Sequence, residues 1–275
     1  MKNQLAAALC SLILVFAAAG SLHAQLAAPN ASGVSLGAVY YTVPDVAAHR
    51  KIWVDIFGAK PVMVGKTEML KIPGAFIVLT KGEPEAGAAL VNHFGLWGKD
   101  LESTRSKLNA AGIPTMPKAQ FIDLPNSVRL EFIDDPNGPD VPSAHHIHYF
   151  VANQQDGLTA RAWYVKTFGA AENARRNGAV PSALFTSPDK WISIDFTAAG
   201  GRGGAAAAPP KPNKGTILDR YALEVKGLDA FVKKIGADGV KVTKPVSTNA
   251  DGIRTAMVVD SLGNEIELTE GLSAK

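Results

Sequence analysis

One pattern of strand, capping residue, amphipathic helix and glycine occurs four times along the sequence. In each copy a short apolar strand precedes a residue suited to begin a helix, and a glycine ends that helix. The four helix starts are Asp45, Asp100, Asn153 and Gly227, which are 55, 53 and 74 residues apart. Repeated units of this size bury their apolar faces against one another. The pattern therefore predicts an α+β fold made of four βαβββ units.

The repeat is itself repeated, so that the second half of the chain resembles the first. VDIFGA at 54–59 returns as VKTFGA at 165–170, an offset of 111 residues. IDDPNG, which ends at Gly138, matches VVDSLG, which ends at Gly263, an offset of 125. The chain is therefore expected to be a duplication of a duplication.

An insertion accounts for most of the difference between these two offsets. Residues 198–215 read AAGGRGGAAAAPPKPNKG, and this content of Gly, Ala and Pro is typical of a flexible loop. With the insertion assigned to the second half, the sequence predicts two tandem domains, residues 33–141 and 142–275.

The N-terminus has the three parts of a secretory signal. Lys2 precedes an apolar run at 5–19, and the small and polar stretch GSLHAQ follows. The run is too short to span a bilayer, and no other run approaches the length of about 18 residues that a membrane helix needs. We expect residues 1–24 to be removed and the protein to be exported, either to the periplasm or outside the cell, with no membrane partner.

Cysteine usage and charge exclude several classes of site. Cys10 is the only cysteine and lies within the signal, so the mature chain would contain no disulfide and no thiolate metal site. The 28 Lys and Arg residues nearly balance the 25 Asp and Glu residues. This balance predicts no nucleic-acid partner, and the sequence makes no prediction of the oligomeric state.

Three strings make the chain similar to a known superfamily. They are VNHFGLWGKDLESTRSKLNAAGI, HHIHYFVANQ followed by WYVKTFGA, and SLGNEIELTEG. With the fourfold βαβββ unit, they resemble the glyoxalase, bleomycin-resistance and extradiol-dioxygenase superfamily, also called the vicinal oxygen chelate superfamily, over essentially the whole mature chain. The resemblance implies two tandem glyoxalase-like domains, in each of which two units curl their sheets into an open cup. It implies no single reaction, because one fold hosts many chemistries.

The resemblance also implies where metal ligands would lie. Members that bind a metal place ligands on the first and last strands of each unit, pointing into the cup. The first-strand positions, seven residues before each helix start, are Ala38, His93, His146 and Arg220. The last-strand positions fall near Val78, Pro142, Asp195 and Glu267. Carboxylates then occur only in the second half, so the resemblance implies that residues 142–275 contain any active site.

Strand alternation supports a ligand set in the second half. Successive side chains of a strand face opposite ways, which puts His146 and His148 on one face and points Glu267 into the cup. We expect His146 and Glu267 to be metal ligands and catalytic groups, with Asp195 or His148 as the third ligand. Such a set of nitrogen and oxygen donors suits Fe, Mn, Zn or Ni, and the metal would act as a Lewis acid on adjacent substrate oxygens.

Arg220 opposes a metal in that cup. A guanidinium has no lone pair to donate and would repel a cation. It would instead pair with Glu267 or Asp195, or bind a carboxylate or oxyanion of the substrate. His93 and Tyr40 are further candidates for ligand contact. For His93 a hydrogen-bonded interior residue is the favoured interpretation, whereas core packing explains Tyr40 equally well. Glu131 alternates with Arg129 along one strand and could face the cup, but a cross-strand ion pair is the favoured interpretation.

Two functions therefore stay open from the sequence. The first is an exported metal-dependent lyase, isomerase or dioxygenase that acts on a small oxygenated molecule through bidentate oxygen chelation. The alternative is a small-molecule binding or sequestering protein of the bleomycin-resistance type, which performs no chemistry.

Overall fold

All four predicted units are present in the computed structural model, which describes residues 26–187, 190–199 and 210–275. The proposed signal at 1–24 and most of the loop at 198–215 lie outside the described residues. Within the described residues no helix is long and apolar enough to cross a membrane. The fold is α+β, as predicted.

The elements follow the chain in four groups. Unit 1 comprises β1 (Val34–Val43), α1 (Val46–Asp55), β2 (Lys60–Val64), β3 (Thr67–Ile72) and β4 (Ala75–Lys81). Unit 2 comprises β5 (Val91–Gly98), α2 (Leu101–Ala110), β6 (Phe121–Leu124) and β7 (Val128–Asp134), with a 3₁₀ turn at Pro125–Ser127. Unit 3 comprises β8 (Ser143–Val151), α3 (Gln154–Phe168), β9 (Ala171–Arg175), β10 (Val180–Ser187) and β11 (Lys190–Ala198). Unit 4 comprises β12 (Leu218–Val225), α4 (Leu228–Ala237), β13 (Val242–Thr248), β14 (Arg254–Val259) and β15 (Glu265–Glu270). Unit 2 thus has one strand fewer than the repeat predicts.

The predicted capping residues begin the helices. Asp45 accepts a hydrogen bond from the backbone N–H of Ala48, and Asp100 and Asn153 cap α2 and α3 in the same way. Each cap satisfies a backbone N–H that has no partner within the helix. Gly227 precedes α4 with a φ of 68°, a left-handed conformation that glycine adopts without strain.

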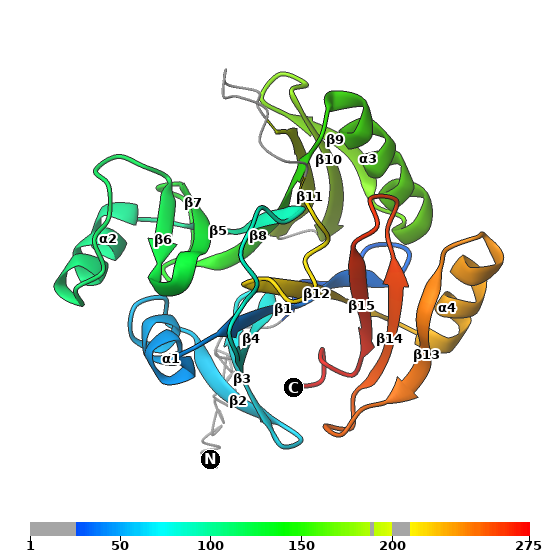
Figure 1. Ribbon diagram of the computed structural model, residues 1–275, viewed down its shortest axis with the longest axis horizontal. Coiled ribbons are helices and arrows are strands. Elements are labelled where there is room, and N and C mark those ends of the chain that lie inside the picture. Colours follow the sequence, from blue (N-terminus) through cyan, green and yellow to red (C-terminus); the bar gives the residue numbers. More distant parts are fainter. Residues whose placement is uncertain (1–25, 188–189, 200–209) are drawn as a thin grey trace, which may run out of the picture.

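The strands form two sheets, and each sheet combines units that are not neighbours along the chain. The strand order is β13-β14-β15-β12-β1-β4-β3-β2 in one sheet and β6-β7-β5-β8-β11-β10-β9 in the other. We call them sheet 1/4 and sheet 2/3 after the units they contain. In Figure 1 the blue strand β1 lies beside the yellow strand β12, to which it is hydrogen-bonded. The expectation that neighbouring units share a cup is therefore wrong.

The short link between β7 and β8 explains part of this pairing. Residues 135–142 turn the chain back, so that β8 pairs antiparallel with β5 in the same sheet. The segments 82–90 and 199–217 instead join strands of different sheets. The predicted domain limit at 141/142 falls in the short link, and neither sheet follows it.

One apolar core packs the helices against both sheets. It contains Trp53 of α1, Phe94 of β5, Phe168 of α3 and Phe231 of α4, among others. Within this core, Tyr149 lies on β8 of sheet 2/3 and Tyr164 lies on α3. Both tyrosines donate hydrogen bonds to Asp260 of unit 4. Burial raises the pKa of Asp260.

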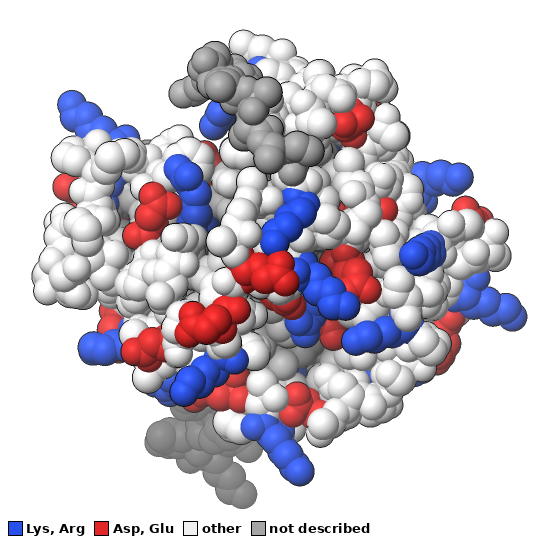
Figure 2. Space-filling view, viewed as in Figure 1, with Lys and Arg blue, Asp and Glu red and all other residues white. Residues whose placement is uncertain are grey.

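The opposite faces of the sheets form the two cups. On the outside of the molecule, Figure 2 shows acidic and basic side chains interspersed on the face in view.

Candidate metal centre

Four buried side chains converge on the cup face of sheet 2/3. His93 lies on β5, Glu131 on β7, and His146 and His148 on β8, which are adjacent strands. Each residue offers one ligand atom, and these atoms lie within 4.8 Å of one another. The predicted alternation of β8 is confirmed, because His146 and His148 share this face.

Three of the ligand atoms are spaced as ligands of one ion would be. The Nε2 atoms of His93 and His146 lie 3.3 Å apart. Both face Oε2 of Glu131, at 3.2 Å from His93 and 3.1 Å from His146. Ligand atoms about 2.1 Å from one ion, in tetrahedral or octahedral geometry, are about 3.0 to 3.4 Å apart. The spacing therefore fits a divalent ion held by two histidines and one carboxylate.

Gly95 makes room for this arrangement. It lies on β5 between the two partner strands, opposite Glu131 of β7 and His146 of β8. A Cβ atom at position 95 would overlap Cε1 and Nδ1 of the His146 ring. The absence of a side chain therefore lets the imidazole lie against the backbone of β5.

Neighbouring side chains orient the two Nε2 atoms. Nδ1 of His93 lies 2.9 Å from Oδ1 of Asn92, and Nδ1 of His146 lies 2.7 Å from Nδ1 of His145. When Nδ1–H of His93 donates to Asn92, its Nε2 carries the lone pair that a metal needs. That lone pair then faces a carboxylate oxygen, an arrangement that a cation between them stabilises.

Within the part of the chain that the structure describes, His148 has a buried ring nitrogen without a hydrogen-bond partner. Its Nε2 lies 2.8 Å from Oγ1 of Thr197, which fixes the ring, whereas its Nδ1 has no partner among these residues. A buried nitrogen of this kind carries a desolvation cost that a ligand can remove. The donor set and this free nitrogen both fit a site that holds a metal and its substrate.

The protonation states suit a metal as well. Burial lowers the pKa of His93 to about 4 and the pKa of His148 well below its ordinary value. Burial alone would raise the pKa of Glu131, but hydrogen bonds with His146 and His93 outweigh it and hold that pKa far below its usual range. At neutral pH His93 and His148 are therefore neutral and Glu131 is ionised, as metal binding requires.

These shifts predict that the metal-free protein loses stability in acid. As pH falls below about 6.5, His93 takes up a proton in the unfolded chain, whereas in the folded protein it stays neutral until about pH 4. The unfolded state then binds more protons, so folding is weakened by roughly 3 kcal/mol between pH 7 and pH 4. Glu131 adds to the loss below its ordinary pKa. Urea unfolding of chelator-treated protein at several pH values measures this loss of stability. His93→Asn should make the free energy of unfolding depend less on pH. A stability that is constant down to pH 4.5 would contradict the prediction.

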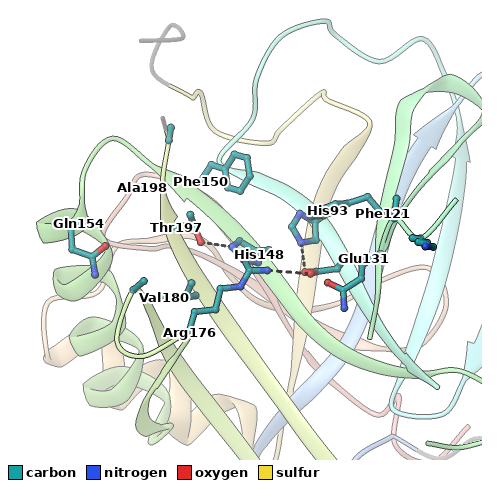
Figure 3. Close-up of a pocket in the computed structure, with 15 residues that line it drawn as sticks. His93, Phe121, Glu131, His148, Phe150, Gln154, Arg176, Val180, Thr197 and Ala198 are labelled. Carbon is teal, nitrogen blue, oxygen red and sulfur yellow. Dashed lines mark hydrogen bonds and ion pairs between the residues drawn. The ribbon is translucent and has the colours of Figure 1, made fainter. Parts of the chain in front are cut away.

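A cavity of about 1020 Å³ opens beside the cluster. His93, Glu131 and His148 contribute to its lining, and Figure 3 shows them pointing toward one another, with Phe121 and Phe150 nearby. His146 is fully buried and is not among the lining residues. A small molecule in the cavity would therefore meet the side of the cluster that His146 does not cover.

A comparison with protein families agrees with the fold. The profile of the Glyoxalase/Bleomycin resistance protein/Dioxygenase superfamily matches residues 143–268. This segment of the chain belongs to that superfamily. The matched segment runs through units 3 and 4, so it contributes strands to both sheets. No curated protein matches the sequence.

Two solved structures share the fold of this chain over most of its length. Glyoxalase I from Zea mays is 13% identical, with a TM-score of 0.65, and the match covers 88% of this chain and 94% of that one. A protein from Bacillus subtilis subsp. subtilis str. 168, assigned as a dioxygenase, is 12% identical, with a TM-score of 0.61, and the match covers 90% and 86%. At such identities the similarity concerns the fold.

The superfamily's ligand positions in unit 2 differ from the prediction. Glu131, and not Pro142, stands at the last-strand position, because Glu131 pairs with Gly95 as Glu267 pairs with Ala222 in unit 4. The match between IDDPNG and VVDSLG misplaced this position, since unit 2 lacks a strand and DPNG follows its last strand. The string LEF around Glu131, which resembles IEL around Glu267, is the signal that identifies it.

The structure does not bring together the predicted ligand set of His146, Glu267 and Asp195. Glu267 lies on β15 of sheet 1/4, whereas His146 lies on β8 of sheet 2/3. Asp195 lies on β11 beside His148, but its Oδ2 is 2.6 Å from Nη1 of Arg175, and its Oδ1 has no hydrogen-bond partner among the described residues. Residues 142–275 alone do not contain the candidate metal centre, because His93 and Glu131 come from the first half of the chain. Whether any of these side chains binds a metal stays a prediction.

Arg220 lies in the cup of sheet 1/4, and not in a cup shared with His146 as the resemblance implies. Its Nε lies 3.0 Å from Oε2 of Glu267, and its guanidinium stacks 3.9 Å from the ring centre of Tyr40. Ala38 and Val78 hold the other two ligand positions and are part of an apolar cluster. Arg220 and Tyr40 therefore lie in a different cup from the histidine cluster, and the predicted ion pair with Glu267 is confirmed.

Replacing Arg220 with alanine is expected to destabilise the protein without changing metal binding. The change leaves the buried carboxylate of Glu267 without its cation and removes the stack on Tyr40. Because about a third of the Arg220 side chain is exposed, we expect a loss of about 2 kcal/mol, less than for a fully buried pair. Arg50→Ala, which removes an exposed pair with Glu68, is the matched control with a much smaller effect. Urea melts and metal titration measure both; a fall in metal affinity in Arg220→Ala would contradict the separation of the two cups.

Proposed function

We propose that the protein is a metal-dependent dioxygenase that acts on a small molecule with two adjacent oxygen atoms. The observation that carries the proposal is the convergence of two imidazole nitrogens and one carboxylate oxygen, 3.1 to 3.3 Å apart, beside a cavity. Two histidines and one carboxylate that leave other positions open are typical of non-haem Fe(II) oxygenases. Superfamily membership supports a small-molecule substrate.

His93, His146 and Glu131 would hold the ion, which, when bound, polarises the substrate oxygens as a Lewis acid and permits chemistry with O₂. Asn92 and His145 orient the two imidazoles through their Nδ1 atoms. His148 lines the cavity with a neutral ring, and its buried Nδ1 has no hydrogen-bond partner among the described residues. It would accept the proton of a substrate hydroxyl that reaches this nitrogen. Thr197 keeps that ring in place through Nε2. Phe121 and Phe150 would exclude water from one side of the substrate.

Metal analysis tests this function first. The protein is purified without chelator and without metal-affinity resin, its metals are measured by mass spectrometry, and Fe(II) is restored anaerobically. We expect about one ion per chain and oxygen uptake when catechol is added as a probe, with both lost in a variant that lacks the Glu131 carboxylate. Bound metal without oxygen uptake from catechol or substituted catechols would favour a lyase or isomerase. Tight binding of small molecules with no metal at all would favour the sequestering alternative.

We also propose that the protein functions outside the cytoplasm, which only the N-terminal sequence supports. Lys2, the apolar run and GSLHAQ together have the order of a secretory signal. Mass spectrometry of the exported chain should find an N-terminus near Gln25, whereas an intact Met1 would contradict the proposal.

A further inference from the structure

The charged side chains around the cavity are mostly cationic. Glu131 is the one carboxylate among the described lining residues, whereas Lys118 and Arg176 are both cations. A divalent ion bound at Glu131 would add to this excess, so the cavity would attract an anion and repel a cation.

Arg176 is held over the candidate metal centre by the shape of its hairpin. Arg176, Asn177 and Gly178 connect β9 to β10 and all have positive φ, at 51°, 54° and 89°. Nη2 of Arg176 lies 3.6 Å from Oε1 of Glu131, the oxygen that does not face the histidines. In Figure 3 its side chain extends toward Glu131. At this distance, and with more than half of the side chain exposed, the pair is weak and can exchange partners.

Lys118 approaches the same cavity from unit 2. It lies on the segment between α2 and β6, with a φ of 60°. Gln120 and Gln154 also line the cavity, and their amide groups can donate hydrogen bonds. Donors from two different units thus surround the opening, while its carboxylate lies at the metal centre.

The wall between the rim and the metal centre is aromatic. Phe121 and Phe150 both line the cavity, and each stands nearly perpendicular to the His93 ring, at 5.1 Å and 6.3 Å between ring centres. The guanidinium carbon of Arg129 lies 4.5 Å from the ring centre of Phe121, although Arg129 is not among the lining residues. Such a wall favours a flat, apolar ligand body.

We infer that the substrate is an aromatic acid, whose anionic group binds Arg176 and Lys118 while its ring lies against Phe121 and Phe150. The inference rests on the proposed function, because it assumes that the two adjacent oxygens of the ring face His93, His146 and Glu131. Arg176 has two alternative partners in this arrangement. It pairs loosely with Glu131 when the site is empty, and it binds the substrate anion when a metal has neutralised Glu131.

A pair of probes that differ in charge tests the inference. Calorimetry measures the affinities of 3,4-dihydroxybenzoate and of its methyl ester for the protein loaded with Zn(II), which cannot turn the probes over. We expect the acid to bind about tenfold more tightly than the ester, as a charge-assisted hydrogen bond provides. Arg176→Gln should reduce this preference to about twofold or less, Lys118→Gln should reduce it partly, and Arg50→Gln, on α1, should leave it unchanged. Added salt should weaken the binding of the acid and leave the binding of the ester unchanged.

The same titrations in metal-free protein separate this inference from the proposed function. If no metal binds, the proposed function fails, and a preference for the acid that disappears in Arg176→Gln still supports an anion site on Arg176. If metal binds but the acid and the ester bind equally, or if Arg176→Gln keeps the full preference, the inference is overturned and the proposed function stands. Circular dichroism and zinc content of each variant show that it is folded and loaded.

Discussion

Replacing Glu131 with glutamine is expected to lower the affinity for a divalent ion by roughly a thousandfold, because a charged ligand becomes a neutral one. Glutamine preserves the size of the side chain, so the change isolates the carboxylate charge that faces Nε2 of both His93 and His146. Titration with Zn(II), Mn(II) and anaerobic Fe(II) measures the loss. Oxygen uptake with the catechol probe should disappear in parallel.

Glu267→Gln is the matched control for this change. Glu267 occupies the equivalent register position in sheet 1/4, opposite Ala222 as Glu131 is opposite Gly95. Its carboxylate pairs with Arg220 and has no histidine of the cluster beside it. We expect Glu267→Gln to bind metal as the wild type does. Loss of metal in Glu267→Gln, with metal retained in Glu131→Gln, would show that Glu267, and not Glu131, is the carboxylate ligand.

Replacing Gly95 with alanine is expected to displace the His146 ring and so to remove metal binding almost entirely. The added Cβ overlaps two ring atoms of His146, and a buried ring on the central strands has little room to move. Overpacking of this kind costs about 1 to 3 kcal/mol of stability. We also expect the metal affinity to fall at least about a hundredfold, since the ring no longer presents Nε2 to the ion.

The control for Gly95→Ala is Gly236→Ala, a position where the added methyl group has room. A Cβ at Gly236 of α4 would meet only Cγ2 of Val242, at 3.9 Å, which is an ordinary contact. In a helix the change from glycine to alanine is stabilising by up to about 1 kcal/mol. Gly236→Ala should therefore melt at the same or a higher temperature and bind metal normally. A folded Gly95→Ala protein with wild-type metal affinity would show that His146 is not a ligand.

Local features of the fold were predictable from the sequence, whereas the pairing of units was not. Asp45, Asp100 and Asn153 cap helices where the pattern placed them, because capping depends on a residue and its next few neighbours. The pairing of β1 with β12 joins residues nearly two hundred positions apart, such as Val34 and Val225. Four copies of one unit leave similar edges, so their sequences do not indicate which first strands meet.

The candidate site was only half predictable for the same reason. His146 and His148 share a strand, and alternation alone put them on one face. The repeat predicts an interior role for His93, because it places the carboxylate of unit 2 near Pro142. It predicts a cross-strand ion pair for Glu131, whereas the structure places Nε2 of both His93 and His146 beside its carboxylate. The strand missing from unit 2 shifted the repeat and hid the partner.

The crossed pairing of units decides whether this chain can have a complete metal site at all. With neighbouring units paired, His93 and Glu131 would face Ala38 and Val78 of unit 1, and His146 would face Arg220 and Glu267 of unit 4. The first of these cups would contain a single histidine, and in the second each carboxylate would have an arginine beside it, Arg175 for Asp195 and Arg220 for Glu267. Pairing unit 2 with unit 3 sorts the polar ligands into one cup and leaves the apolar and cationic residues to the other. One cup is thus free to lose its ligands and serve as scaffold, while the other inherits a full set drawn from both halves of the sequence.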